Sequence, residues 1–178
     1  MDLKLFESLP MPNQDKNEWR AFLEFVSSYF ANRNIMNPVI AEIGVHTNCQ
    51  KAFYEKLLNG RHFGIDISTN YSMPEILGDS HNPSTVQAFF EKTKVSSIDL
   101  LFIDGDHEYE AAKADYELWS PHVNYLIAFH DSISWAGVKK LWDEIVDKHT
   151  TNPNISFVTF ECWHTPRYRY GIGLIIKK

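Results

Sequence analysis

The stretch that decides the fold is IDLLFIDGDH, residues 98–107. Its first six residues are almost all apolar, which is typical of a strand buried on both faces of a parallel sheet. The polar segment from Asp104 to His107 follows this strand at once. Because ligands of open α/β sheets bind outside the carboxyl ends of the strands, we expect a functional site where this strand ends.

Strand and helix patterns alternate on both sides of this stretch. Helical spacing of apolar residues predicts helices at 17–33, 47–58, 84–94 and 109–119, and a further helix that contains Val138, Leu141, Trp142 and Ile145. Short apolar runs predict strands at 39–43, 62–67, 75–77, 98–103, 125–129, 156–160 and 171–176. The last two strands have no helix between them, so we expect them to form an antiparallel hairpin.

This alternation predicts an α/β fold. We expect a Rossmann-like, doubly wound, mostly parallel seven-stranded sheet with a C-terminal antiparallel hairpin, in a three-layer α/β/α arrangement. The chain has 178 residues, of which 44% are hydrophobic, so it is long enough for one such core and short for two. We therefore expect residues 1–36 to form a helical extension packed on the core, and residues 37–178 to form the domain itself.

Composition and charge exclude several classes of partner. The chain has 17 Lys and Arg against 23 Asp and Glu, a formal net charge of -6, and lacks the basic excess that nucleic-acid binding requires. No segment approaches 18 consecutive apolar residues, and the first residues do not resemble a signal peptide. Cys49 and Cys162 lie far apart and do not suggest a disulfide framework or a zinc site. We expect a cytoplasmic protein with no nucleic-acid or membrane partner.

An acidic residue stands at the end of each of the first five predicted strands. These residues are Glu42, Asp66, Asp79, Asp104 and Asp131. A single Asp after a strand is more often a turn former or a helix cap than a ligand. Five acidic residues at five strand ends indicate a ligand site along one edge of the sheet.

The loop after the first strand, EIGVHTNC at residues 42–49, limits the kind of ligand. It has one glycine and does not match the GxGxxG pattern that lets a backbone approach a pyrophosphate. This disfavours a dinucleotide and leaves a nucleoside without phosphates as a candidate. Asp66 follows Gly44 by 22 residues, which is the spacing of an acidic residue that binds ribose hydroxyls.

Several short motifs together carry a family resemblance. They are AEIGV (41–45), GIDI (64–67), GDS (78–80), IDLLFIDGDHEYE (98–110), LWSP (118–121), IAFHD (127–131) and GVKKLWDE (137–144). From Val39 to Ile176 the chain resembles the class I S-adenosylmethionine-dependent methyltransferases. Its most specific part, residues 98–131, is similar to metal-dependent small-molecule O-methyltransferases of the macrolide-sugar and catechol types.

This resemblance implies S-adenosyl-L-methionine as cofactor and assigns the residues that bind it. Glu42 and Gly44 would lie beside the methionine moiety, Asp66 would bind the ribose, and Asp79 and Ser80 would lie beside the adenine. The full set of implied cofactor-binding residues is Glu42, Gly44, Val45, His46, Asp66, Ile67, Asp79, Ser80 and Asp104. Cys49 and its neighbour Asn48 depart from the small residues that relatives commonly have, and His46 either binds the cofactor or packs against the loop.

The resemblance also implies a divalent metal and a general base. Asp104, His130 and Asp131 would be the metal ligands, and His107 would be the catalytic base. His130 stands where relatives usually have an acidic or amide ligand. Because a ring nitrogen suits Mn²⁺, Fe²⁺ or Zn²⁺ better than Mg²⁺, the identity of the metal stays open.

Three functions remain as alternatives. The first is an O-methyltransferase that acts on a hydroxyl of a small-molecule acceptor with the help of a metal. The second is a degenerate methyltransferase fold that binds the cofactor or a protein without turnover, and the third is a metal-dependent hydrolase or oxygenase. The aromatic and basic segment at 163–170 either lines a substrate pocket or forms a homodimer contact, and we favour the dimer contact.

Overall fold

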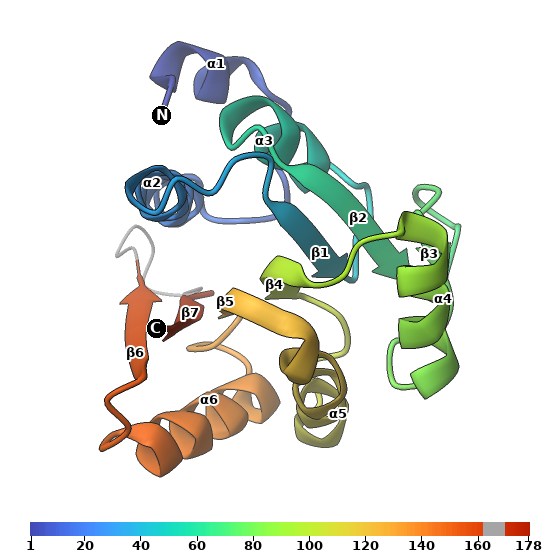
Figure 1. Cartoon of the computed structure of the whole chain (residues 1–178), viewed down its shortest axis with the longest axis vertical. Coiled ribbons are helices and arrows are strands. Elements are labelled where there is room, and N and C mark those ends of the chain that lie inside the picture. The colour runs from blue at the N-terminus through green and yellow to red at the C-terminus, as the bar shows by residue number, and fades with distance from the viewer. Residues whose placement is uncertain (162–169) are drawn as a thin grey trace.

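The computed structural model describes residues 1–161 and 170–178, and in this part of the chain the strands form one seven-stranded sheet. Figure 1 shows the sheet crossing the middle of the molecule. The strand order is β3-β2-β1-β4-β5-β7-β6. The bounds are β1 (Val39–Ile43), β2 (Arg61–Asp66), β3 (Ile76–Leu77), β4 (Ile98–Ile103), β5 (Val123–Phe129), β6 (Ile155–Phe160) and β7 (Ile172–Lys177).

Most strand pairs are parallel, and β7 is the exception. It pairs antiparallel with β5 on one side and with β6 on the other, while β1, β2, β3, β4 and β5 pair parallel with one another. The expected mostly parallel sheet with a C-terminal antiparallel hairpin is therefore confirmed.

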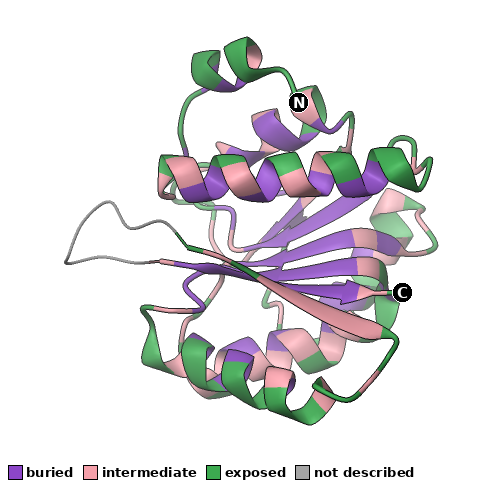
Figure 2. Cartoon of the chain, turned by 90° about the vertical axis from the view of Figure 1, so that its left-hand side faces the viewer, coloured by how far each residue is buried: buried purple, intermediate pink, exposed green. Residues whose placement is uncertain are grey.

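Helices cover both faces of this sheet. One layer contains α1 (Leu3–Ser8), α2 (Lys16–Asn32) and α3 (Gln50–Leu57), and the other contains α4 (Pro83–Thr93), α5 (Tyr109–Trp119) and α6 (Ala136–His149); a short 3₁₀ helix, η1 (Ser120–His122), follows α5. Figure 2 shows the central strands buried between the two layers, whereas the edge strand β6 has intermediate exposure. This arrangement confirms the three-layer α/β/α fold.

The side chains of β4 explain why its sequence is apolar throughout. Leu100 and Phe102 belong to the core under α1, α2 and α3, whereas Leu101 and Ile103 belong to the core under α4, α5 and α6. Because successive side chains of a strand point to opposite faces, a central strand between two helical layers needs apolar residues at nearly every position.

The N-terminal helices pack closely into the first of these cores. Phe6 of α1 and Trp19 of α2 are fully buried, and both rings contact Phe53 of α3. The side chain of Asp15 caps α2 by accepting hydrogen bonds from the first-turn N–H groups of Asn17 and Glu18. A division of the chain into an extension and a domain at residue 36 stays a prediction.

Two local features differ from the sequence expectation. Helix α1 has six residues, which is too short for a helical period to be visible in the sequence, and it was not predicted. Helix α3 begins at Gln50 rather than near residue 47, because His46 and Asn48 adopt left-handed backbone angles, with φ of 42° and 58°. The aromatic segment predicted to line a pocket or form a contact lies almost wholly outside the described residues.

In the sheet, β2 and β3 follow one another on one side of β1, whereas β4 and β5 lie on its other side, so the order of the strands reverses between β1 and β4. Beyond these strands, the N–H of Asp104 donates to the carbonyl of Ile43 at 2.9 Å and the N–H of His130 donates to the carbonyl of Ile103 at 3.0 Å. The loops after β1, β4 and β5 therefore leave the sheet side by side, which is the position of ligand sites in doubly wound sheets. In the described residues, no helix has the length and apolar character needed to cross a membrane.

Candidate active site

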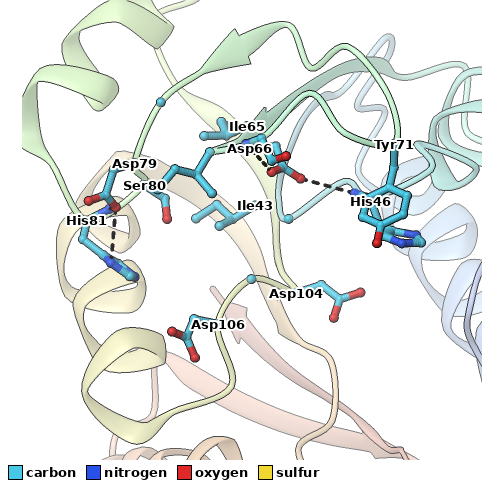
Figure 3. Close-up of a pocket in the computed structure, with 15 residues that line it drawn as sticks. Ile43, His46, Ile65, Asp66, Tyr71, Asp79, Ser80, His81, Asp104 and Asp106 are labelled. Atoms are coloured by element: carbon cyan, nitrogen blue, oxygen red, sulfur yellow. Dashed lines mark hydrogen bonds and ion pairs between the residues drawn. The ribbon is translucent and has the colours of Figure 1, made fainter.

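A cavity of about 480 Å³ opens at the carboxyl ends of β1, β2 and β4 (Figure 3). Its size is within the usual range of small-ligand sites. The residues predicted to bind the cofactor that line it are Gly44, His46, Asp66, Ile67, Asp79, Ser80 and Asp104. Tyr71, whose ring centroid lies 4.0 Å from that of His46, also lines the cavity and was not predicted.

Gly44 allows two loops to approach each other at the base of this cavity. Its φ is +82°, and a Cβ atom there would lie 2.2 Å from the carbonyl oxygen of Asp104. No residue with a side chain fits this position without displacing the backbone after β4. The single glycine of the first loop therefore allows this loop and the backbone after β4 to lie against each other at the base of the cavity.

Asp66 holds the first loop by hydrogen bonds to its backbone. Its Oδ2 atom accepts from the N–H groups of Val45 at 3.1 Å and His46 at 3.3 Å, and its Oδ1 atom accepts from the N–H of Ser68 at 2.9 Å. Val45 is buried and is not among the residues that line the cavity, so its predicted contact with the cofactor stays a prediction. The contact of Asp66 with a ribose stays a prediction.

Glu42 is fully buried and is not among the residues that line the cavity. Its Oε2 atom lies 2.7 Å from Nε2 of His62, and burial raises the pKa of Glu42. The ring of Tyr54 stacks on His62 at 5.3 Å between centroids. Glu42 therefore lies in a buried cluster with His62 and Tyr54, and its predicted position beside the methionine moiety stays a prediction.

The other end of the cavity contains an acidic residue that the sequence did not single out. Asp115 of α5 is fully buried, and its Oδ1 atom lies 3.5 Å from Nε2 of His81, which lines the cavity. Burial raises the pKa of Asp115 to about 6. In the sequence Asp115 lies in the middle of a helix, where an acidic residue gives no signal of a site.

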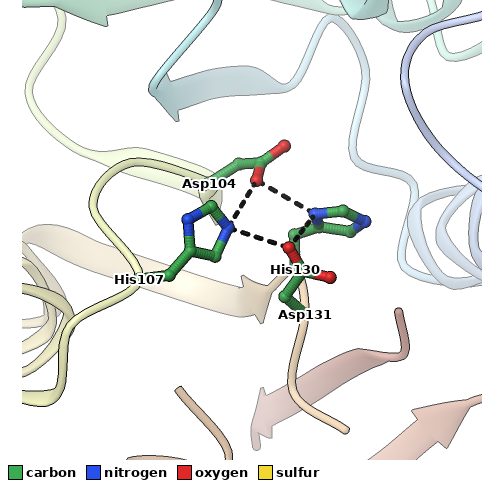
Figure 4. Close-up of side chains that lie close together, drawn as sticks. All are labelled: Asp104, His107, His130 and Asp131. Carbon is green, nitrogen blue, oxygen red and sulfur yellow. Dashed lines mark hydrogen bonds and ion pairs between the residues drawn. The ribbon is translucent and has the colours of Figure 1, made fainter. Parts of the chain in front are cut away.

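Four side chains from the ends of β4 and β5 meet beside the cavity (Figure 4). Oδ1 of Asp104 lies 3.0 Å from Nδ1 of His130 and 3.5 Å from Nε2 of His107. Oδ2 of Asp131 lies 2.9 Å from Nε2 of His107 and 3.4 Å from Nδ1 of His130. One atom from each residue lies within 4.8 Å of all the others, so the predicted ligands and the predicted base form one cluster.

The backbone and the surrounding rings fix this four-residue cluster. Asp131 has a left-handed backbone, with φ of 57°, which a residue other than glycine adopts rarely and often at functional sites. His130 is 4% exposed, and its ring stacks between Phe102 and Tyr170. Trp135 is 51% exposed, with its ring centroid 5.1 Å from that of His107.

The electrostatics of the cluster favour positive charge at its centre. Hydrogen bonds to Asp104 and Asp131 raise the pKa of His107 to about 9. Burial alone would lower the pKa of His130, but the carboxylate of Asp104 raises it to about 10. Burial also opposes ionisation of Asp104 and Asp131, yet the two histidines hold both carboxyl pKa values below their usual range.

This donor set fits a divalent cation. Two carboxylate oxygens and two imidazole nitrogens lie close to one another. Imidazolium rings balance the negative charge of the two carboxylates when no ion is bound, and a divalent cation would balance it in their place. Asp104, His130 and Asp131 would hold the ion, as predicted, and His107 is close enough to be a fourth ligand.

Glu18 of α2 approaches the same region and was not predicted. It is 2% exposed, and its Oε2 atom accepts a hydrogen bond of 2.9 Å from the N–H of Gly171. Burial raises its pKa to about 7. No pattern in the sequence indicates Glu18, because its position depends on how α2 packs against the segment near Gly171.

One family model and one curated protein match part of this chain in sequence. Residues 51–132 match a family model described as a methyltransferase domain. A curated protein of Sinorhizobium fredii (strain NBRC 101917 / NGR234), the uncharacterized protein y4gI, is 32% identical over 85 residues. This match covers 45% of the present chain and 8% of the length of that protein.

Solved structures of methyltransferases have the same architecture. MycE of the mycinamycin biosynthetic pathway, in complex with Mg and SAH, matches with a TM-score of 0.61 and 15% identity over 86% of this chain and 48% of its own. An O-methyltransferase from Bacillus cereus, in complex with SAH, matches with a TM-score of 0.60 and 13% identity over 99% of this chain and 88% of its own. These findings confirm the resemblance inferred from the sequence: the chain has the fold of the class I S-adenosylmethionine-dependent methyltransferases and resembles the O-methyltransferases among them.

Proposed function

We propose that the chain is an S-adenosylmethionine-dependent methyltransferase that methylates a hydroxyl of a small molecule with the help of a divalent cation. The observation that carries this proposal is the position of Asp104, which lines the cavity and also belongs to the four-residue cluster. A cofactor in the cavity and an acceptor at the cluster would therefore be neighbours. Such proximity is the main requirement of a transfer reaction.

The cavity suits the nucleoside part of the cofactor. It has carboxylates from Asp66 and Asp79 at two neighbouring strand ends, which can accept hydrogen bonds from ribose hydroxyls and an adenine amino group. The crystals of MycE and of the Bacillus cereus enzyme contain SAH, the demethylated cofactor, which supports the same ligand here.

The cluster suits the activation of a hydroxyl group. S-adenosylmethionine supplies a methyl group on a positively charged sulfur, and a bound divalent cation lowers the pKa of a hydroxyl group that coordinates it. In this chain, Asp104, His130 and Asp131 would hold the ion. The positive charge of the ion would lower the pKa of His107 from about 9, so that a neutral ring could take the hydroxyl proton at Nε2. The half-exposed ring of Trp135 beside His107 offers a contact surface for the acceptor.

Calorimetry with the purified protein tests the cofactor part of this proposal. We expect SAH and S-adenosylmethionine to bind with one site per chain, and we expect Asp66→Ala to weaken both by 10-fold or more, on the order of 1.4 kcal/mol. Asp147→Ala, at an exposed position on α6, is the matched control and should bind as the wild type does. No binding by the wild-type protein at millimolar ligand would overturn the proposal.

A second experiment tests His107 as the base. Once an acceptor screen that detects SAH has found turnover, we expect His107→Gln to lower kcat by about 100-fold, the usual contribution of a general base. The affinity for Mn²⁺, measured without cofactor, should change by less than about 3-fold, because three ligands remain. If the affinity for Mn²⁺ falls together with kcat, His107 is a ligand and not the base. His149→Gln, at the C-terminal end of α6, serves as the control.

A further inference from the structure

In the four-residue cluster, each carboxylate presents one oxygen to the centre and has its other oxygen held by a side chain outside the cluster. For Asp104, Oδ1 is the inner atom, near His130 and His107. Its Oδ2 atom accepts a hydrogen bond of 3.1 Å from Nε2 of Gln14. This contact joins residues 90 positions apart in the chain.

Asp131 has the same arrangement with the opposite oxygen. Its Oδ2 atom is the inner one, near His107 and His130. Its Oδ1 atom accepts a hydrogen bond of 3.0 Å from the hydroxyl of Ser134. The two carboxylates are thus fixed in the same way by donors from two different segments.

The two donors are themselves held by the backbone. Gln14 lies directly before Asp15, the residue that caps α2, and its N–H donates to the carbonyl of Pro12 at 2.8 Å. Ser134 lies in a loop where the N–H of Ile133 donates to the carbonyl of Tyr170 at 3.1 Å. Because backbone hydrogen bonds hold the chain at Gln14 and beside Ser134, each donor can restrict the rotation of the carboxylate that it contacts.

We propose that Gln14 and Ser134 are positioning residues that hold the outer oxygens of Asp104 and Asp131, so that one oxygen of each faces the cation. This inference rests on the proposed function, since it requires a cation in the cluster. A carboxylate without an outer partner rotates about its Cβ–Cγ bond, and part of the binding free energy is spent on ordering it. Both donors lie outside the segment 51–132 that matches the methyltransferase family model, Gln14 far before it and Ser134 just after it.

The experiment measures binding of Mn²⁺ alone, by calorimetry or by electron paramagnetic resonance of free Mn²⁺, with the full chain and no cofactor. Loss of an outer partner typically weakens metal binding by 10- to 100-fold. We expect Gln14→Leu and Ser134→Ala each to weaken Mn²⁺ binding by about 10-fold or more. Ser134→Thr keeps the hydroxyl and should restore the affinity to within about 3-fold of the wild type.

Matched controls separate this effect from a general loss of structure. Gln87→Leu and Ser28→Ala remove the same groups from exposed positions on α4 and α2 and should leave Mn²⁺ binding unchanged. Binding of SAH should stay within about 2-fold of the wild type in every variant, since none of these residues lines the cavity. If Gln14→Leu does not fold, Gln14→Asn, whose amide is one methylene shorter, takes its place.

The outcomes distinguish the inference from the proposed function. Equal Mn²⁺ affinity in the wild type, Gln14→Leu and Ser134→Ala would overturn the inference and leave the function standing. A wild-type protein that binds SAH but no Mn²⁺ would overturn both the inference and the role of the cation, while the methyltransferase proposal would remain. Failure of Ser134→Thr to restore binding would overturn the part that concerns Ser134.

Discussion

At the scale of single residues, burial gives the same side-chain type different tasks. Asp66 is bound by backbone N–H groups and shapes a loop, whereas Asp104 and Asp131 face two histidines in the proposed cation site. Asp115 is fully buried beside one histidine at the far end of the cavity. The environment of each carboxylate, more than its presence at a strand end or in a helix, decides its chemistry.

Asp115 makes a prediction about stability and pH. Burial raises its pKa from the ordinary 3.8 to about 6, and the groups that face it are His81, Ser80 and Asp79. At pH values between these two pKa values, the carboxyl group of Asp115 is protonated in the folded protein and ionised in the unfolded chain. Rising pH therefore lowers the free energy of unfolding. The free energy of unfolding of the wild type, relative to Asp115→Asn, should therefore fall by about 1 to 3 kcal/mol from pH 4 to pH 7.

Urea unfolding of both proteins at a series of pH values measures this difference. Asp147→Asn, at an exposed position on α6, is the control and should show a constant offset from the wild type across the same range. A constant offset for Asp115→Asn as well would mean that the buried carboxyl does not titrate differently in the folded protein.

At the scale of elements, the loops after β1, β4 and β5 make the site. The extended backbone pairing beyond β1 and β4 holds Gly44 against Asp104, and β5 delivers His130 and Asp131 to the same edge. The segment before α2 and the loop before α6 then close around the cluster through Gln14 and Ser134. The parallel strands set which residues meet, and the flanking elements set how they are oriented.

Gly44→Ala tests this arrangement of loops. An alanine at φ of +82° is strained, and its Cβ would meet the backbone of Asp104, so we expect a loss of about 2 kcal/mol or more in the free energy of unfolding, and weaker SAH binding. The matched control is Gly105→Ala in the same cavity. Its Cβ would lie 3.2 Å from a side-chain atom of Ile43, so a smaller loss is expected. Equal effects in denaturation and calorimetry would contradict the close approach of the two loops.

At the scale of the whole molecule, negative charge gathers where a cofactor with a positive sulfur and a divalent ion would bind. Asp66, Asp79, Asp104 and Asp106 line one cavity, and Asp131 lies beside it. These residues are part of the 23 acidic residues behind the formal net charge of -6, and they lie together at the carboxyl edge of the sheet. The N-terminal segment, outside the part of the chain that matches the family model, completes one core with α1 and α2 and contributes Gln14 and Glu18 near the cluster.

The sequence by itself determined the succession of the strands and of the helices from α2 onward, and the burial of both faces of β4, because local periodicity can be read along the chain. The meeting of Asp104, His107, His130 and Asp131 was implied by the family resemblance, and it agrees with the rule that parallel strands end at one edge of the sheet. Only the tertiary structure decided the contacts of Glu42, Gln14 and Asp115. Glu42 faces His62 under α3, Gln14 reaches Asp104 across 90 positions, and Asp115 turns inward from α5. Such contacts depend on how helices pack against the sheet, and no local pattern encodes the packing of side chains that are distant in sequence.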